Sequence, residues 1–262
     1  MDFQKKERYN VNDLIKIMEM LRSENGCPWD REQTHESIRM NFLEEVYEAC
    51  DAIDNKNDDN LKEELGDVLM QVVFHSRIAE EAGKYNFDDV ANDVCQKLVF
   101  RHPHVFGDVD VSSSSEVLDV WDKMKLQEKK STTYTSEMDR VPKALPALMY
   151  SEKIQKRARK AGFDWPDVTG ALEKVVEETK EVEQAIRDNN KIEEEIGDLL
   201  FAVVNVARFC KVDCEQALYN ASQKFTRRFA YVEEKAGENL KNMSLEEMDK
   251  LWDEYKKTVE VK

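Results

Sequence analysis

The chain has 262 residues, of which 36% are charged, and its formal net charge is −16 at pH 7. This acidity excludes the basic surface of proteins that bind the nucleic-acid backbone, so we expect no nucleic-acid partner. Few glycines and prolines (8 and 5 residues) and apolar residues at helical spacing predict an all-α protein of one or two domains.

No feature of the sequence indicates export or membrane insertion. Residues 1–10 are charged and lack an apolar segment, so we expect no signal peptide. The longest apolar run, 199–204, is too short to span a membrane. The five cysteines lack the spacing of a zinc site and are typical of reduced thiols. We therefore expect a cytoplasmic protein with no membrane contact.

The first half of the chain predicts five helices separated by glycine, proline or cap-rich segments. In chain order they cover 11–22, a segment beginning near 34, 59–82, 88–101 and a segment beginning near 115. Gly83 and Pro103 are the expected stops of the third and fourth helices. The stretch 128–142 is polar and lacks apolar periodicity, which places a domain boundary there.

The second half repeats this order. Its predicted helices cover 147–160, the two arms of an acidic segment around 177–198, 217–228 and 245–255. Segment 162–167 takes the place of segment 27–30. We therefore predict two tandem homologous helical-bundle domains. Their expected limits are 1–130 for the N-terminal domain, 131–143 for a linker and 144–262 for the C-terminal domain.

Acidic residues recur at helical spacing in both halves. Across a turn at 54–58 the first half has Glu45, Glu48, Glu64 and Asp67. Across a turn at 188–190 the second half has Glu178, Glu181, Glu195 and Asp198. Residues three apart share a helix face, so an antiparallel hairpin would bring each set of four carboxylates together.

Such a cluster predicts a cation. Facing carboxylates repel one another unless a positive charge lies between them. Oxygen-only ligands favour Mg²⁺, Mn²⁺ or Ca²⁺ over zinc, and Mg²⁺ commonly binds carboxylates together with substrate phosphates. A solvated acidic face is the alternative. Gly66 and Gly197 each interrupt a predicted helix, which favours either close helix packing or a crowded site.

Basic residues follow each acidic segment at a spacing of four. Lys97 with Arg101, and Lys224 with Arg228, are candidates for binding phosphate oxygens. Solvated surface charge is the alternative for each pair.

Aromatic residues and histidines carry weaker signals. Trp121 and Trp252 could stack on a base or ribose, or could simply pack. His75, His102 and His104 have no counterpart in the second half, which favours structural roles. The same absence argues against a di-iron carboxylate bundle, which needs Glu-x-x-His motifs.

The order of these motifs resembles that of the MazG family of nucleoside triphosphate pyrophosphohydrolases. The resemblance rests on the EExxE and ExxD motifs of both halves, on GCPWD at 26–30 and on FRHPHVF at 100–106, over nearly the whole chain. It implies a homodimer with domains of the all-α NTP pyrophosphatase type. It also implies Mg²⁺-dependent hydrolysis of ribo- or deoxynucleoside triphosphates between the α- and β-phosphates, giving the monophosphate and pyrophosphate.

Carried over by motif, the resemblance assigns roles in the C-terminal domain. The metal would be held by Glu178, Glu181, Glu195 and Asp198. The nucleotide would be contacted by Lys174, Lys191, Glu194, Asp198, Lys224, Arg227, Arg228 and Trp252. Glu177 or Glu178 would accept the proton of the attacking water. A second metal site in the N-terminal domain would use Glu45, Glu48, Glu64 and Asp67, with Lys97, Arg101 and Trp121 as phosphate candidates.

Two positions distinguish the halves. Aligned on the acids, Lys174 corresponds to Asn41 and Lys191 to Asn60. The N-terminal site thus lacks two of the expected phosphate cations, so we expect the main activity in the C-terminal domain. A phosphohydrolase that releases orthophosphate, an enzyme acting on alarmone-type nucleotides, and a non-catalytic acidic helical adaptor are the alternatives.

Overall fold

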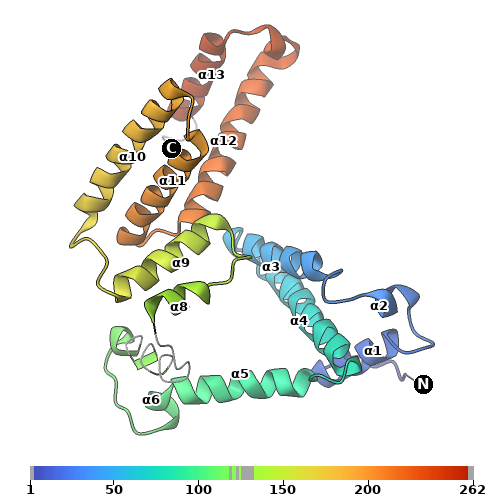
Figure 1. Cartoon of the computed structure of the whole chain (residues 1–262). Helices are drawn as coiled ribbons and strands as arrows, with labels where there is room; N and C mark the ends of the chain where they lie inside the picture. The colour runs from blue at the N-terminus through green and yellow to red at the C-terminus, as the bar shows by residue number, and fades with distance from the viewer. Residues whose placement is uncertain (1–2, 118–119, 122–123, 125–132, 259–262) are drawn as a thin grey trace. The chain divides into compact units, whose positions relative to one another are not determined.

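The computed structural model describes residues 3–117, 120–121, 124 and 133–258. Every regular element in these ranges is a helix, so the prediction of an all-α fold is confirmed (Figure 1). Contacts between residues divide the chain into two compact units, Met1–Lys129 and Lys130–Lys262. No helix within the described ranges is long and apolar enough to cross a membrane.

The first unit is built around the long helix α4. In chain order its helices are α1 (Val11–Leu21), α2 (Pro28–Glu32), α3 (Arg39–Asp54), α4 (Asp58–Glu81), α5 (Phe87–Arg101) and α6 (Pro103–Phe106). Met18, Val73 and Phe74 are buried where α1 packs on α4, and Ile38 completes this core. Residues 114–117, 120–121 and 124 are also helical, where the sequence predicts the helix that carries Trp121.

The prediction for segment 25–38 is wrong in two details. Pro28 begins the short helix α2 because a proline is tolerated at the first helical position. Helix α3 begins at Arg39 rather than near residue 34, since Thr34 and Ser37 exchange side-chain to backbone hydrogen bonds of 2.9 and 3.2 Å. Such local bonds compete with the helical pattern.

The second unit has a parallel organisation. Its helices are α8 (Tyr134–Asp139), α9 (Ala147–Lys160), α10 (Val168–Asp188), α11 (Ile192–Phe209), α12 (Cys214–Ala236), the 3₁₀ helix η1 (Gly237–Asn242) and α13 (Leu245–Thr258). Helix α8 falls inside the segment predicted as a linker. It is held to α9 by the buried Glu137, which pairs with Arg140 at 2.6 Å and with Arg157 at 3.1 Å. Because ion pairs hold α8 in place, its sequence shows no apolar periodicity from which a helix could be predicted.

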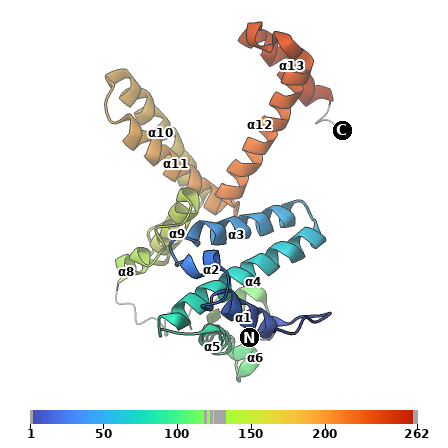
Figure 2. The same ribbon diagram turned by 90° about the vertical axis from the view of Figure 1, so that its right-hand side faces the viewer.

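Each unit contains an antiparallel hairpin that carries the predicted acids, α3–α4 or α10–α11 (Figure 1). The α10–α11 turn is tight, and two of its residues, Asn189 and Lys191, have left-handed backbones with φ of 50° and 57°. Helices α12 and α13 form a second pair in the C-terminal unit. Figure 2 shows this pair diverging from the α10–α11 hairpin, beyond the end where α12 contacts α9 and α11.

Candidate functional site

The acidic residues of α10 and α11 come together across the hairpin. One oxygen each of Glu178, Glu195 and Asp198 lie within 4.8 Å of one another, and a second group of the same size joins Glu178 to Glu177 and Glu181. Glu178 belongs to both groups. It is therefore the centre of the cluster, and the four residues that the sequence suggests as metal ligands are divided between these two overlapping groups.

Glu178 is the most deeply buried member, with 3% of its surface exposed. Its Oε1 atom lies 2.5 Å from Lys174 Nζ, which also lies 2.9 Å from Glu177 Oε1. Hydrogen bonds to Glu178 and then to Glu177 raise the pKa of Lys174 above its usual range. The other oxygen of Glu178, Oε2, is buried and has no hydrogen-bond partner among the described residues. A buried carboxylate oxygen without a donor is suited to a cation.

The charges of the cluster act on one another. The negative charge of Glu178 is the largest cause that raises the pKa of Glu181, followed by burial, and Glu195 adds to it. The donor set consists of carboxylate oxygens alone. It therefore fits a hard divalent cation, which would relieve the repulsion between the acids.

The α3–α4 hairpin carries a second acidic cluster. Oxygens of Glu45, Glu48 and Glu64 lie within 4.8 Å of one another. Burial is the first cause that raises the pKa of Glu45, followed by the charge of Asp67 and those of the other two acids, while a hydrogen bond from Gln71 opposes the shift. The pKa of Glu64 is raised as well, by burial and then by Glu48.

The two glycines inside α4 and α11, Gly66 and Gly197, do not mark crowded positions within the chain. A Cβ atom added to Gly66 or Gly197 would meet no atom within 4 Å. The expectation of close packing or crowding at these glycines is therefore wrong for the isolated chain.

The predicted nucleotide-binding residues are divided between the acidic hairpin, where Lys174 contacts Glu178, and the α12–α13 pair. At the tip of the hairpin, Lys191 Nζ lies 3.2 Å from Glu194. On α12, Lys224 and Arg227 are exposed, and the guanidinium of Arg228 lies over the Trp252 ring at 5.3 Å.

The N-terminal unit has a matching pair. The guanidinium of Arg101 lies over the Trp121 ring at 5.4 Å, and Lys97 is exposed. His102 also contacts Trp121, with ring centroids 4.8 Å apart. Both tryptophans thus pack against arginines, the alternative that the sequence left open beside base stacking.

One pair of side chains escaped the sequence analysis. His35 and His75 stack with their rings 5.1 Å apart and share a hydrogen bond of 2.8 Å between their Nδ1 atoms. Burial and then the neighbouring His35 lower the pKa of His75. No spacing signal links residues 40 positions apart, so only the fold could reveal this pair.

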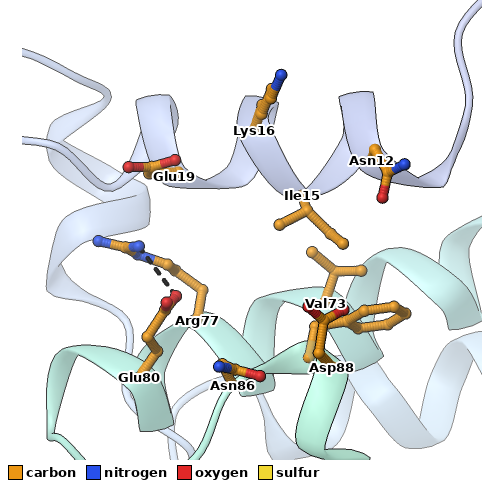
Figure 3. A pocket seen from close by; sticks show the side chains of 10 residues that line it. Asn12, Ile15, Lys16, Glu19, Val73, Arg77, Glu80, Asn86 and Asp88 are labelled. Atoms are coloured by element: carbon orange, nitrogen blue, oxygen red, sulfur yellow. Dashed lines mark hydrogen bonds and ion pairs between the residues drawn. The ribbon is translucent and has the colours of Figure 1, made fainter. Parts of the chain in front are cut away.

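Two cavities lie beside the hairpins. One of about 450 Å³ lies between α1, α4 and the start of α5, where Ile15 faces Val73 and an Arg77–Glu80 ion pair of 3.0 Å lies nearby (Figure 3). None of the predicted site residues lines it. The other, of about 400 Å³, lies between α9, the 162–165 loop and α11, and its residues were also missed.

Comparison with known proteins finds the same domain twice in this chain. A family model described as the MazG nucleotide pyrophosphohydrolase domain matches residues 33–106 and 167–233, and each match contains one acidic hairpin. The nucleoside triphosphate pyrophosphohydrolase/pyrophosphatase MazG of Thermotoga maritima is 47% identical over 247 residues, which cover 93% of this chain and 94% of that protein.

Two further relatives cover most of this chain. The nucleoside triphosphate pyrophosphohydrolase of Escherichia coli K12 is 45% identical over 255 residues, which cover 94% of this chain and 97% of that protein. The uncharacterized protein YabN of Bacillus subtilis is 50% identical over 249 residues, covering 92% of this chain and 50% of that protein. The resemblance inferred from the motifs is confirmed: this chain belongs to the MazG nucleotide pyrophosphohydrolase family.

Proposed function

We propose that this protein hydrolyses ribo- and deoxynucleoside triphosphates between the α- and β-phosphates, at the α10–α11 hairpin, and releases pyrophosphate. The observation that carries the proposal is the buried carboxylate of Glu178, which lies inside a cluster of further acids. One of its oxygens contacts Lys174, and the other has no hydrogen-bond partner in the part of the chain that the structure describes. The printed names of the relatives from T. maritima and E. coli support this reaction class.

The acids of the hairpin fit Mg²⁺, with Mn²⁺ as a substitute. The ligands would be Glu178, Glu181, Glu195 and Asp198. When bound, the ion would supply positive charge against the phosphates and acidify a nearby water. The N-terminal acids fit the same ions, and we propose that they form a second, weaker nucleotide site, because Asn41 stands where the other hairpin has Lys174.

Side chains of the protein would supply the proton acceptor and the positive charge that the reaction also needs. Glu177 or Glu178 would accept the proton of the attacking water, since both lie next to Lys174 and within the acidic cluster. Lys174 holds the Glu178 carboxylate in place. The cations of α12, Lys224, Arg227 and Arg228, would stabilise the charge that develops on the pyrophosphate.

A homodimer would bring these cations to the acids, because within one chain α12 diverges from α10–α11 (Figure 2). Apolar side chains exposed on the hairpin support an interface there: Leu172, Val176, Ile186, Leu200 and Val203. The open space around Gly197 would let a helix of the second copy approach. Mixing inactive Glu178→Gln and Arg228→Ala chains should restore part of the activity if each site uses both copies. A monomeric mass in solution would contradict this arrangement.

The reaction is tested by incubating the purified protein with Mg²⁺ and each ribo- and deoxynucleoside triphosphate in H₂¹⁸O. Pyrophosphate as the product, with the label in the monophosphate, supports water attack at the α-phosphorus. Release of orthophosphate, or turnover of an alarmone-type nucleotide alone, contradicts the proposal. An adaptor would show neither turnover nor thermal stabilisation by Mg²⁺ with nucleotide.

A further inference from the structure

We propose that the cavity between α9, the 162–165 loop and α11 receives the base of the nucleotide, and that Arg22 closes the corresponding space in the N-terminal unit. The inference rests on the proposed function, since it assumes a nucleotide substrate. It assigns substrate contacts to residues outside the acidic hairpin motifs.

The walls of the cavity suit a flat ring. They are apolar or aromatic and comprise Ile154, Ala158, Phe163, Trp165 and Phe201. The Trp165 indole lies so close to Gly170 that a Cβ atom there would overlap it, so the glycine at this position makes room for the wall. Sites for planar ligands commonly combine such apolar surfaces with a few placed polar groups.

Two buried amides supply those polar groups. Gln155 is 6% exposed, and its Nε2 group donates to the Phe201 carbonyl at 2.8 Å. Its Oε1 atom is buried and has no partner among the residues that the structure describes. Asn205 is 8% exposed, and its Oδ1 accepts from Arg208 Nε at 2.8 Å, which leaves its Nδ2 group as a donor.

An acceptor and a donor in one cavity match a nucleobase, because the pairing edge of a base presents both kinds of group side by side. A buried acceptor left unpaired is costly, and a donor on the ligand would remove that cost. The amide of Asn205 is held by Arg208, whose guanidinium pairs with Asp164 at 2.5 and 3.0 Å. The polar part of the cavity is therefore rigidly held before a ligand arrives.

The cavity lies along the same side of α11 as the acids. Asp198, Phe201 and Asn205 follow one another at intervals of three and four residues, which places them on one face. Seven residues of α-helix separate Asp198 from Asn205, about 10 Å along the axis. A nucleotide lying along α11 could place its phosphates at the acids and its base in the cavity.

The N-terminal unit fills the equivalent space. Four residues before the matching glycines, Gly26 and Gly162, stand Arg22 and Ala158, and seven residues after the matching aspartates stand Phe74 and Asn205. The Arg22 side chain is 6% exposed, and its guanidinium lies over the Phe74 ring at 5.3 Å.

Further bonds fix Arg22 in this position. It donates to the carbonyls of Asp30 and Gln33 and pairs with Glu81 at 2.8 Å. Arg77, the counterpart of Arg208, pairs with Glu80 and Glu81 of its own helix (Figure 3). A large cation and a phenyl ring thus occupy the space that an alanine and an asparagine leave open in the C-terminal unit.

The test is to close the cavity with Ala158→Arg and to measure KM for adenosine and cytidine triphosphates against KM for ribose 5-triphosphate, which lacks a base. We expect the ratio of nucleotide KM to base-free KM to rise by about 10-fold or more, because the variant removes contacts made only by the base. The matched variant Arg22→Ala should leave this ratio at its wild-type value. An unchanged ratio in a folded Ala158→Arg protein would overturn the proposal.

If Ala158→Arg does not fold, Asn205→Asp provides a second test, since it keeps the shape and replaces the Nδ2 donor by an acceptor. The same ratio should rise, and an unchanged ratio contradicts the proposal. Binding of free adenosine or cytidine, followed by Trp165 fluorescence with Trp165→Phe as the control, requires no hydrolysis. Nucleoside binding without turnover would overturn the proposed reaction alone, whereas turnover of triphosphates without a Trp165 response would overturn the cavity proposal alone.

Discussion

The two acidic hairpins each have two pairs of carboxylates spaced three residues apart, yet they differ in the charge that lies beside the central carboxylate. In α10–α11, Glu178 is buried against Lys174. In α3–α4, Glu45 has Asn41 one turn before it, and burial together with neighbouring acids raises its pKa. The lysine one turn away thus places a positive charge beside the buried carboxylate of Glu178. Without the lysine, the acid is held more readily in its protonated form.

The largest effect that we expect from this difference is on turnover. Glu178→Gln removes a charged ligand and a candidate proton acceptor from the C-terminal hairpin, so kcat should fall by roughly 10²-fold or more. The matched change in the N-terminal hairpin, Glu45→Gln, should leave most of the activity. Steady-state pyrophosphate release measures both.

Circular dichroism serves as the control, because Glu178→Gln should stay folded. Full activity in a folded Glu178→Gln protein would refute the assignment to the C-terminal hairpin. A larger loss from Glu45→Gln would reverse the order of the two sites.

A second, smaller effect should come from the lysine itself. Lys174→Met removes a charge-assisted hydrogen bond and leaves Glu178 buried without a counter-ion, which costs about 1–3 kcal/mol. We expect a lower melting temperature in EDTA and a rise in KM of roughly 10-fold. Its mirror image, Asn41→Lys, should lower the pKa of Glu45 and strengthen Mg²⁺-dependent nucleotide binding by the N-terminal hairpin, measured by calorimetry in a Glu178→Gln background. No gain in binding would show that the lysine does not distinguish the sites.

Mg²⁺ should stabilise the protein, because the acids of both hairpins repel one another at neutral pH. The pKa values of Glu45, Glu64 and Glu181 are raised from 4.5, so their favourable contribution to stability is present below pH 4.5 and is lost as the pH rises through the raised values. A bound cation replaces the missing protons.

At about 100 times its Kd, Mg²⁺ should add about 2.7 kcal/mol and raise Tm by several degrees at pH 7.5. EDTA should reverse the shift, and Glu178→Gln should reduce it. A Tm independent of Mg²⁺ at millimolar concentrations would argue against both metal sites.

The smallest effect that we expect is a loss of stability at low pH caused by histidine. It should be confined to the N-terminal unit, which alone contains histidine. The pKa of His75 is lowered from 6.5, so its contribution to stability is present above pH 6.5 and is lost as the pH falls through the lowered value of the folded state. Between pH 7.5 and 5.5 the urea midpoint should fall by roughly a few tenths molar. His35→Gln should lessen the fall, because it removes the neighbouring positive charge. An equal fall in the variant would exclude a role for the pair.

The sequence was sufficient for the parts that repeat or that depend on local spacing. Helical periodicity predicts that acids of each hairpin come together, and the structure groups Glu178 with Glu195 and Asp198, and Glu45 with Glu48 and Glu64, while Asp67 lies outside the second group. The end of α5 at Arg101 follows from the proline at position 103. Helix α8 could not be predicted because ion pairs to Glu137, rather than an apolar face, hold it. The roles of Gln155 and Asn205 were also hidden, since buried amides look like surface residues until the fold encloses them.

The tight turn at 189–191 has a consequence for how the acidic cluster forms during folding. The five acids of the cluster lie within one segment of 22 residues, 177–198, and the α10–α11 pairing is local. Local contacts require little loop closure and form early in folding. The acidic cluster can therefore assemble on a single helical hairpin before α12 and α13 pack. The hairpin would then form the first part of the site during folding.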